Sequence, residues 1–336
     1  MPRCKIFLFT YKRNDLLPRA VHHLINQTFT DWTCEVHNDS PENMFPAEFI
    51  KSLNDRRFMV DNHDINLGGT ASFNLAFQKC HLDYVSILED DNWWEPEFLQ
   101  EMISLMDSNQ KIDVLWNNMH IWRETVNSEW ENMHKTIWPM DGKNQKFNWP
   151  NHKQALGALH STGAMMFRGK NAEKYAIPDS CELSIIEGVR ERTFEFPIYL
   201  LRKPLANFSL TFQTNRSKDP IIWTGSQIML LASFIQSAEN KHKTFEQTLA
   251  FYRAKKPAPV ATFFLAIIFI FKDFRLLKYF RFRDWVAINR WAIRNLLDFR
   301  RLQKYLAANG EVYNFLLSNT LKQNRKISDC PQIVEP

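Results

Sequence analysis

The sequence has few of the features that mark secreted or membrane-spanning proteins. Its five cysteines are scattered and include no Cys-x-x-Cys pair, which argues against a disulfide framework or a zinc ribbon. The longest apolar run, residues 260–271, is shorter than the roughly 20 residues that a helix needs to cross a bilayer. A strand-like apolar segment starts within five residues of Met1, which leaves no room for a signal peptide. We therefore expect a cytoplasmic protein with reduced thiols and no membrane span.

Glycine is also scarce, with nine in 336 residues and none in residues 10–14. A nucleotidyltransferase acting on a sugar phosphate should carry a glycine-rich, basic phosphate loop after its first strand, so that class is disfavoured although it stays open as an alternative. The apolar fraction of 45% is that of a packed protein and predicts one large domain with an appendage, or two modest domains.

The net charge of +5 is unevenly distributed along the chain. Residues 255–304 contain twelve Lys or Arg residues but three acidic ones, and they are rich in Phe, Tyr and Trp. This composition favours either an anionic membrane surface or a homo-oligomer contact as the partner of the C-terminal region. Nucleic acid is disfavoured because no recognised nucleic-acid motif accompanies the charge.

Apolar runs and helical patterns alternate over the first 125 residues, which predicts an α/β fold with a mainly parallel sheet. We expect a loop over residues 123–155, strands at 162–167, 196–200 and 206–212, and only helices from residue 221. The predicted organisation is a catalytic domain over residues 1–220 and a helical region over 221–336. Its main break is at residues 255–259 (Lys-Lys-Pro-Ala-Pro), where proline ends a helix.

Three consecutive carboxylates, Glu89, Asp90 and Asp91, follow the apolar strand predicted at residues 84–88. Ligands of parallel sheets sit at the carboxyl ends of strands, and hard oxygen ligands suit Mg²⁺ or Mn²⁺. An acidic turn at the N-terminus of the next helix is the structural alternative. Repulsion among three carboxylates favours a bound cation.

The sequence around this triplet resembles family 2 glycosyltransferases with the GT-A fold, a Rossmann-like mixed sheet. Four patterns occur in the family's order: a T-Y-x-R turn, a D-x-S-like turn, an N-x-G…N stretch and the acidic motif followed by Trp and Pro. The residues that match the nucleotide-sugar site are Thr10, Tyr11, Arg13, Asp39, Asn66, Gly68, Asn74, Glu89 and Asp90. The resemblance implies that Asp39 contacts the nucleobase.

The resemblance further implies an inverting transfer of one sugar from a UDP- or dTDP-linked donor to a glycan or lipid-linked acceptor, with Asp91 and Glu89 as ligands of Mn²⁺ or Mg²⁺. Glu187 is the first candidate for the catalytic base, and the other candidates are Asp179 and Glu191. An exposed helix face carrying Glu187, Arg190 and Glu191 is the structural alternative.

Other residues extend this hypothesis. Arg216 is a candidate contact for the diphosphate, and Trp93 and Trp94 are candidates for stacking on sugar rings, with one of them in the core. Processive polymer synthesis is disfavoured because Ala287 stands where the family's Q-x-x-R-W motif has glutamine. A catalytically silent, membrane-bound scaffold of the same fold is a further alternative.

Overall fold

The computed structural model describes residues 2–212, 217–295 and 298–328. The chain forms two compact units. The first comprises Met1–Asn148, His160–Ala176 and Phe194–Asn215, and the second comprises Trp149–Leu159, Ile177–Thr193 and Arg216–Pro336. The chain leaves the first unit for the last time close to the boundary predicted at residue 220, but two earlier segments also belong to the second unit.

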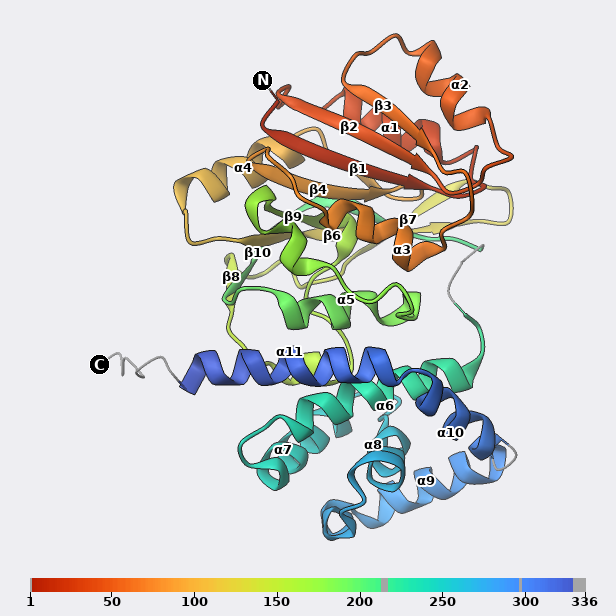
Figure 1. Cartoon of the computed structure of the whole chain (residues 1–336), viewed down its shortest axis with the longest axis vertical. Helices are drawn as coiled ribbons and strands as arrows, with labels where there is room; N and C mark the ends of the chain where they lie inside the picture. The colour runs from red at the N-terminus through yellow and green to blue at the C-terminus, as the bar shows by residue number, and fades with distance from the viewer. Residues whose placement is uncertain (1, 213–216, 296–297, 329–336) are drawn as a thin grey trace. The chain divides into compact units, whose positions relative to one another are not determined.

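The first unit is built on a mixed sheet whose leading strands are parallel and lie in the order β3-β2-β1-β4 (Figure 1). The strands and the helices between them are β1 (Cys4–Thr10), α1 (Leu17–Ile25), β2 (Trp32–Asn38), α2 (Phe45–Ser52), β3 (Phe58–Asn62), α3 (Gly69–Asn74) and β4 (Tyr84–Glu89). This alternation confirms the predicted α/β fold. The carboxyl ends of the four strands lie along one edge of the sheet.

The remaining strands extend the same sheet and include antiparallel pairs. They are β5 (Trp93–Trp94), β6 (Val114–Glu124), β7 (Trp130–Thr136), β8 (Gln145–Phe147), β9 (Met165–Arg168) and β10 (Ile198–Leu210). Strand β9 lies antiparallel between β4 and β6, and β10 runs parallel to β6.

The loop predicted over residues 123–155 is wrong, because β6 and β7 form an antiparallel pair there and β8 pairs with β10. Contacts between aromatic and polar side chains on neighbouring strands stabilise this part of the sheet, such as the 2.8 Å hydrogen bond from Trp122 Nε1 to Asn207 Oδ1. The two strands predicted at 196–200 and 206–212 are one strand whose register shifts at Pro204. The strand predicted from residue 162 begins only at Met165.

Helices α1, α2 and α4 (Phe98–Ser108) contribute to a single apolar core with one face of β1 and β2. Leu17, Val21 and Leu24 recur at helical spacing and point into this core. On the other face, the rings of Phe7 and Phe9 stack against His37. The two faces of β1 are thus both covered, one by aliphatic and one by aromatic side chains.

The second unit is helical, as predicted from residue 221 onward for the residues that the structure describes. Its helices are α5 (Ile186–Arg190), α6 (Pro220–Gln236), α7 (Lys241–Arg253), α8 (Val260–Ala266), α9 (Phe282–Asn295), α10 (Phe299–Ala308) and α11 (Gly310–Ser328). Helix α6 is apolar on all sides and packs against α8, α10 and α11. The proline-rich break at residues 255–259 falls between α7 and α8, both of which belong to the second unit.

Within the described parts of the chain, every helix is too short or too polar to cross a bilayer. Among the described cysteines, Cys4, Cys34, Cys80 and Cys181 form no disulfide bond. Cys330 lies outside the described residues.

Candidate functional site

The acidic triplet and Asp39 lie at the same edge of the sheet, on either side of β1. Strand β1 pairs with β2 through Thr10 and Asn38 and with β4 through Phe9 and Glu89. The turns that follow these three strands therefore lie close together. Several predicted donor-site residues come from these turns.

Within the triplet, Asp90 is buried and Asp91 is more accessible. Asp90 Oδ2 accepts a hydrogen bond from the backbone N–H of Tyr11, 3.3 Å away. Burial raises the pKa of Asp90, and the charge of Asp91 raises it further. The carboxylate of Asp91, with 17% of its side chain exposed, contacts the guanidinium of Arg13. The same guanidinium lies 3.6 Å from Asp90 Oδ1, so one cation faces two carboxylates.

Glu89 is oriented by neighbours that its sequence context does not reveal. Its Oε2 accepts a 2.6 Å hydrogen bond from Asn92 Nδ2, and Asn92 Oδ1 accepts one from the backbone of Ser209 on β10. A Cβ atom added at Gly163 would lie 3.0 Å from Glu89 Oε2. Asn92 thus positions Glu89 against a glycine that makes room for it.

Arg19 is a site residue that the sequence reasoning missed. Its Nη2 donates a 2.6 Å hydrogen bond to the backbone carbonyl of Asp91, and its guanidinium lies 3.9 Å from the ring of Trp93 and 4.1 Å from that of Trp130. Burial lowers its pKa to about 10. The sequence feature that could have indicated this role is the position of Arg19 in the first turn of α1, the helix after β1.

Trp93 and Trp94 are both buried, so neither ring has a face open to a sugar. The structure therefore does not support the predicted stacking. Trp94 stacks on Phe98 with ring centroids 3.9 Å apart and donates from Nε1 to the carbonyl of Gly163. Trp93 packs against Arg19 and Trp122. These rings fix the turn after the acidic triplet.

The carboxylate of Asp39 accepts four hydrogen bonds from its own chain. Its Oδ1 accepts from His63 Nδ1 at 2.9 Å and from the backbone N–H of Leu67 at 2.7 Å. Its Oδ2 accepts from the backbone N–H of Gly68 at 3.1 Å and from Asn66 Nδ2 at 3.2 Å. A carboxylate has about four lone-pair positions, so its acceptor capacity is filled. Asp39 therefore clamps the loop over residues 63–68.

Other residues of the predicted donor site lie in this loop or at the ends of neighbouring elements. Gly68 precedes α3 with φ of +80°, a conformation that glycine adopts without strain, and Asn74 ends that helix. Asn66 also donates to the backbone carbonyl of Asp39 at 2.7 Å. Thr10 is buried at the end of β1.

The three candidates for the catalytic base lie in the second unit and differ in exposure. Asp179 is exposed, Glu187 is partly exposed and Glu191 is fully buried. Glu191 accepts hydrogen bonds from Gln154 Nε2 at 2.8 Å and from the backbone N–H of Leu159 at 2.6 Å, which gives it a structural role. The alternative of an exposed helix face is wrong, because Arg190 is also fully buried. Arg216, the proposed diphosphate contact, lies outside the described residues.

A comparison with protein families matches residues 5–173, half of the 336-residue chain, to the model of glycosyl transferase family 2. The chain belongs to glycosyl transferase family 2. The matched stretch contains the four motifs of the donor site and ends before the three candidate bases. The region matched to the family is therefore the half of the chain that carries the acidic triplet.

Two curated relatives each match part of the chain. The chain is 28% identical over 129 residues to an uncharacterized glycosyltransferase of Methanocaldococcus jannaschii, covering 38% of this chain and 44% of that protein. It is 26% identical over 104 residues to WcaA of Escherichia coli, a glycosyl transferase whose name assigns it to colanic acid biosynthesis, covering 31% and 37%. The chain thus matches less than half of the length of these relatives.

Among solved structures, the fold resembles that of S. aureus TarS. The complex of TarS with UDP-GlcNAc aligns with a TM-score of 0.59, covering 97% of this chain and 92% of that one at 13% identity. The complex with UDP aligns with a TM-score of 0.56. At this identity the likeness shows a shared fold, which is the predicted GT-A sheet with a C-terminal helical region.

Proposed function

We propose that the protein is an inverting, metal-dependent glycosyltransferase that moves one sugar from a nucleotide-diphosphate donor to a glycan or lipid-linked acceptor. The observation that carries this proposal is the partly exposed Asp91 carboxylate just after β4, which is paired with the guanidinium of Arg13. Family membership and the position of Asp39 beside the same strand β1 support it.

Asp91 and Glu89 are the residues that would hold Mn²⁺ or Mg²⁺. Both offer hard carboxylate oxygens, and the ion pair of Asp91 with the Arg13 guanidinium is consistent with a cation at this carboxylate. When bound, the divalent ion neutralises the negative charge that builds on the leaving diphosphate. Asp90, buried and bonded to Tyr11, positions the turn after β1 rather than the metal.

Arg13 has a second role in this proposal. Its planar guanidinium can pair with two phosphate oxygens, whereas in the structure it faces Asp90 and Asp91. A bound diphosphate would draw Arg13 from the carboxylates, and the divalent ion would take its place at Asp91. Donor and metal are then expected to bind together rather than independently.

The nucleoside end of the donor is assigned to the turn after β1, with Thr10 and Tyr11, and to the loop over residues 63–68. The TarS complexes contain UDP and UDP-GlcNAc, which supports a UDP-linked donor here, with a dTDP-linked donor as the alternative. Because the acceptor capacity of Asp39 is filled by the loop, we assign Asp39 a positioning role that holds Asn66 and Gly68 for the nucleoside.

Glu187 remains our candidate for the catalytic base, because Glu191 is used in a structural hydrogen-bond network. In the proposed step, the Glu187 carboxylate takes the proton from the acceptor hydroxyl while that oxygen forms a bond to C1 of the sugar. The bond from C1 to the diphosphate oxygen breaks, and its electron pair leaves with the nucleoside diphosphate. The configuration at C1 is inverted.

Helix α9 supports a membrane partner for the C-terminal region. Phe282, Val286 and Ile293 recur at helical spacing and are exposed, with 83% and 80% exposure for Phe282 and Ile293. Arg283, Arg290 and Arg294 lie on the same helix. Exposed apolar side chains beside arginines suit an anionic lipid surface, so we propose peripheral attachment to the inner face of the cell membrane, where lipid-linked acceptors would lie.

The test of the proposed activity is a panel of nucleotide sugars assayed for metal-dependent hydrolysis and transfer. We expect one donor to be turned over with Mn²⁺ or Mg²⁺, and Asp91→Asn to reduce turnover at least about a hundredfold through the loss of transition-state charge neutralisation. Asp141→Asn, at an exposed aspartate in the same unit, is the matched control.

Retained turnover in Asp91→Asn would refute the metal assignment. Release of pyrophosphate from a nucleoside triphosphate and a sugar phosphate would instead identify a nucleotidyltransferase. Binding of nucleoside diphosphate that is indifferent to Mn²⁺, without turnover of any donor, would identify a silent scaffold.

A further inference from the structure

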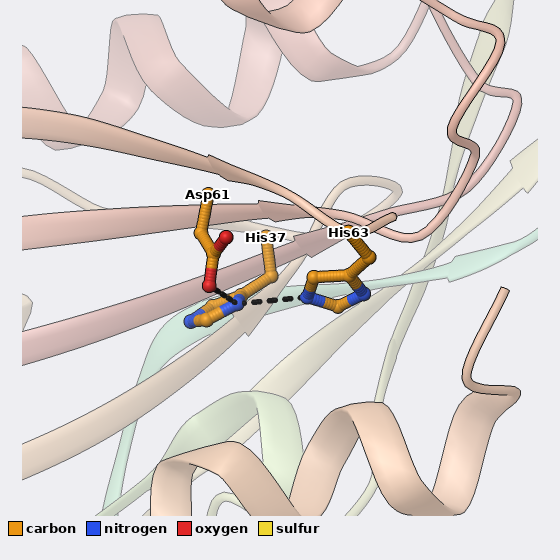
Figure 2. A group of neighbouring side chains, drawn as sticks. All are labelled: His37, Asp61 and His63. Carbon is orange, nitrogen blue, oxygen red and sulfur yellow. Dashed lines mark hydrogen bonds and ion pairs between the residues drawn. The ribbon is translucent and has the colours of Figure 1, made fainter. Parts of the chain in front are cut away.

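A second group of potential metal ligands lies beside Asp39, where β3 leads into the loop over residues 63–68. It comprises His37 on β2, Asp61 directly opposite it on β3, and His63 just after β3 (Figure 2). His37 Nδ1 lies 3.1 Å from His63 Nε2 and 3.5 Å from Asp61 Oδ2. Both imidazoles are buried, and the aromatic rings of Phe7 and Phe9 hold that of His37 in place.

The outer nitrogen of each imidazole faces a carboxylate. His63 Nδ1 is 2.9 Å from Asp39 Oδ1, and His37 Nε2 is 2.9 Å from Glu35 Oε1, while the other oxygen of Glu35 pairs with Lys5. The contact of His63 Nδ1 with Asp39 is a hydrogen bond, which favours the ring proton on Nδ1 and leaves a lone pair on Nε2 of His63 for its other neighbour. The inner nitrogens lie 3.1 Å apart, so either a ring proton of His37 or a metal ion can join them, and both require the lone pair of His63 Nε2.

We propose that His37, His63 and Asp61 bind a transition-metal ion of the Zn²⁺ class. Ligand atoms about 2.05 Å from a tetrahedral zinc are about 3.3 Å apart, and the two spacings at His37 Nδ1 bracket this value. Neutral imidazole is a preferred ligand of zinc, and a carboxylate on the outer nitrogen is the usual partner of a zinc-bound histidine. The Asp61 side chain is 55% exposed, which gives the ion a path from solvent and leaves a position for water.

The site has a consequence for the neighbouring loop. A metal on His63 Nε2 fixes the ring proton on Nδ1, where it strengthens the hydrogen bond to Asp39, and Asp39 holds Leu67 and Gly68. Zinc would therefore order the loop over residues 63–68. The effect on nucleotide affinity rests on the proposed function, whereas metal binding at the three ligands does not.

The experiment measures metal in the full chain after equilibration with zinc and removal of free ion by gel filtration. We expect about one equivalent in the wild type and in Asp91→Asn, and a tetrahedral absorption spectrum when Co²⁺ replaces zinc. His63→Gln should lose the ion, and Asp61→Asn, at a mostly exposed side chain, should weaken binding at least about tenfold. His81→Ala, at an exposed histidine, should keep it.

Circular dichroism tests whether His63→Gln is folded. If it is not, the zinc content of Asp61→Asn tests the site. Absence of stoichiometric zinc from the wild type would overturn the proposal and leave a shared proton between the two histidines. Zinc retained in both Asp61→Asn and His63→Gln, or lost in Asp91→Asn alone, would also overturn it. Sugar turnover is not a readout here, so failure of the zinc site and failure of the glycosyltransferase proposal remain distinguishable.

Discussion

Gly163 offers a direct test of the acidic site, because an alanine at this position would crowd the side chains of Glu89 and Asn92. The added methyl carbon would lie 3.0 Å from Glu89 Oε2 and 3.2 Å from Asn92 Nδ2, closer than ordinary van der Waals contact. The 2.6 Å hydrogen bond between these two side chains ties them together, so both must move by a few tenths of an ångström. Gly163 has no left-handed φ, so alanine adds crowding without backbone strain.

The expected effects on stability and on activity differ in size. Crowding against side-chain ends costs about 1 kcal/mol, and the reduced freedom of the unfolded chain offsets about 0.4–1 kcal/mol of this. The free energy of unfolding should therefore change little. A displacement of 1 Å in a catalytic array can cost about a hundredfold in rate, so a few tenths of an ångström at Glu89 should cost about tenfold.

The assay compares metal-dependent turnover of the nucleotide sugar, and the metal concentration that gives half of it, in Gly163→Ala and Gly157→Ala. Gly157 is a matched control, because its added carbon would meet only the Lys153 carbonyl at 3.8 Å. Urea unfolding of both variants measures stability. Turnover and metal dependence that stay at the wild-type level in Gly163→Ala would refute the role of Glu89.

Three further outcomes follow from named contacts. In Asp39→Asn one acceptor oxygen with two hydrogen bonds is lost, so the loop over residues 63–68 should be destabilised by about 3 kcal/mol, measured by hydrogen exchange at Leu67 and Gly68. In Glu191→Gln the new amide N–H₂ group would face the N–H of Gln154 or of Leu159, so the free energy of unfolding measured in urea should fall by about 1–3 kcal/mol. Glu187→Gln should lower turnover without this loss of stability. Replacing both Phe282 and Ile293 by Glu should reduce sedimentation with anionic vesicles at least about tenfold. Unchanged sedimentation, or a loss of concentration-dependent self-association in this variant instead, would favour a second copy of the chain as the partner.

The sequence was enough to predict that Asp39 and the acidic triplet lie at one edge of the sheet, because each motif there is short and follows a strand. Parallel strands bring their carboxyl ends together whatever lies between them, so chain order was enough to place Asp39 beside the acidic triplet. The fold class followed from the same alternation. These features depend on local pattern and on a topological rule, and both can be taken from one sequence.

The supporting contacts could not be predicted in this way. Asn92 and Ser209 meet because β10 returns to the sheet more than a hundred residues later, and Gly163 reaches Glu89 through the antiparallel insertion of β9. The strands within residues 123–155 were missed because polar, charged and aromatic residues pair across β6 and β7. The apolar alternation that marks a strand in a sequence is therefore lacking there. The burial of Glu191 depends on Gln154 and Leu159, which no local periodicity connects to it.

The contacts of Arg13 lead to a specific order of events under the proposed function. The Asp91 carboxylate pairs with the Arg13 guanidinium, and the same guanidinium faces the buried Asp90. A divalent ion entering alone would have to displace this cation from Asp91, which is costly for a side chain that is 13% exposed. A diphosphate entering with the ion supplies Arg13 with new anionic partners at the moment it releases Asp91. The affinity for metal should therefore rise in the presence of nucleoside diphosphate, and by linkage the affinity for the nucleotide should rise by the same factor in the presence of metal.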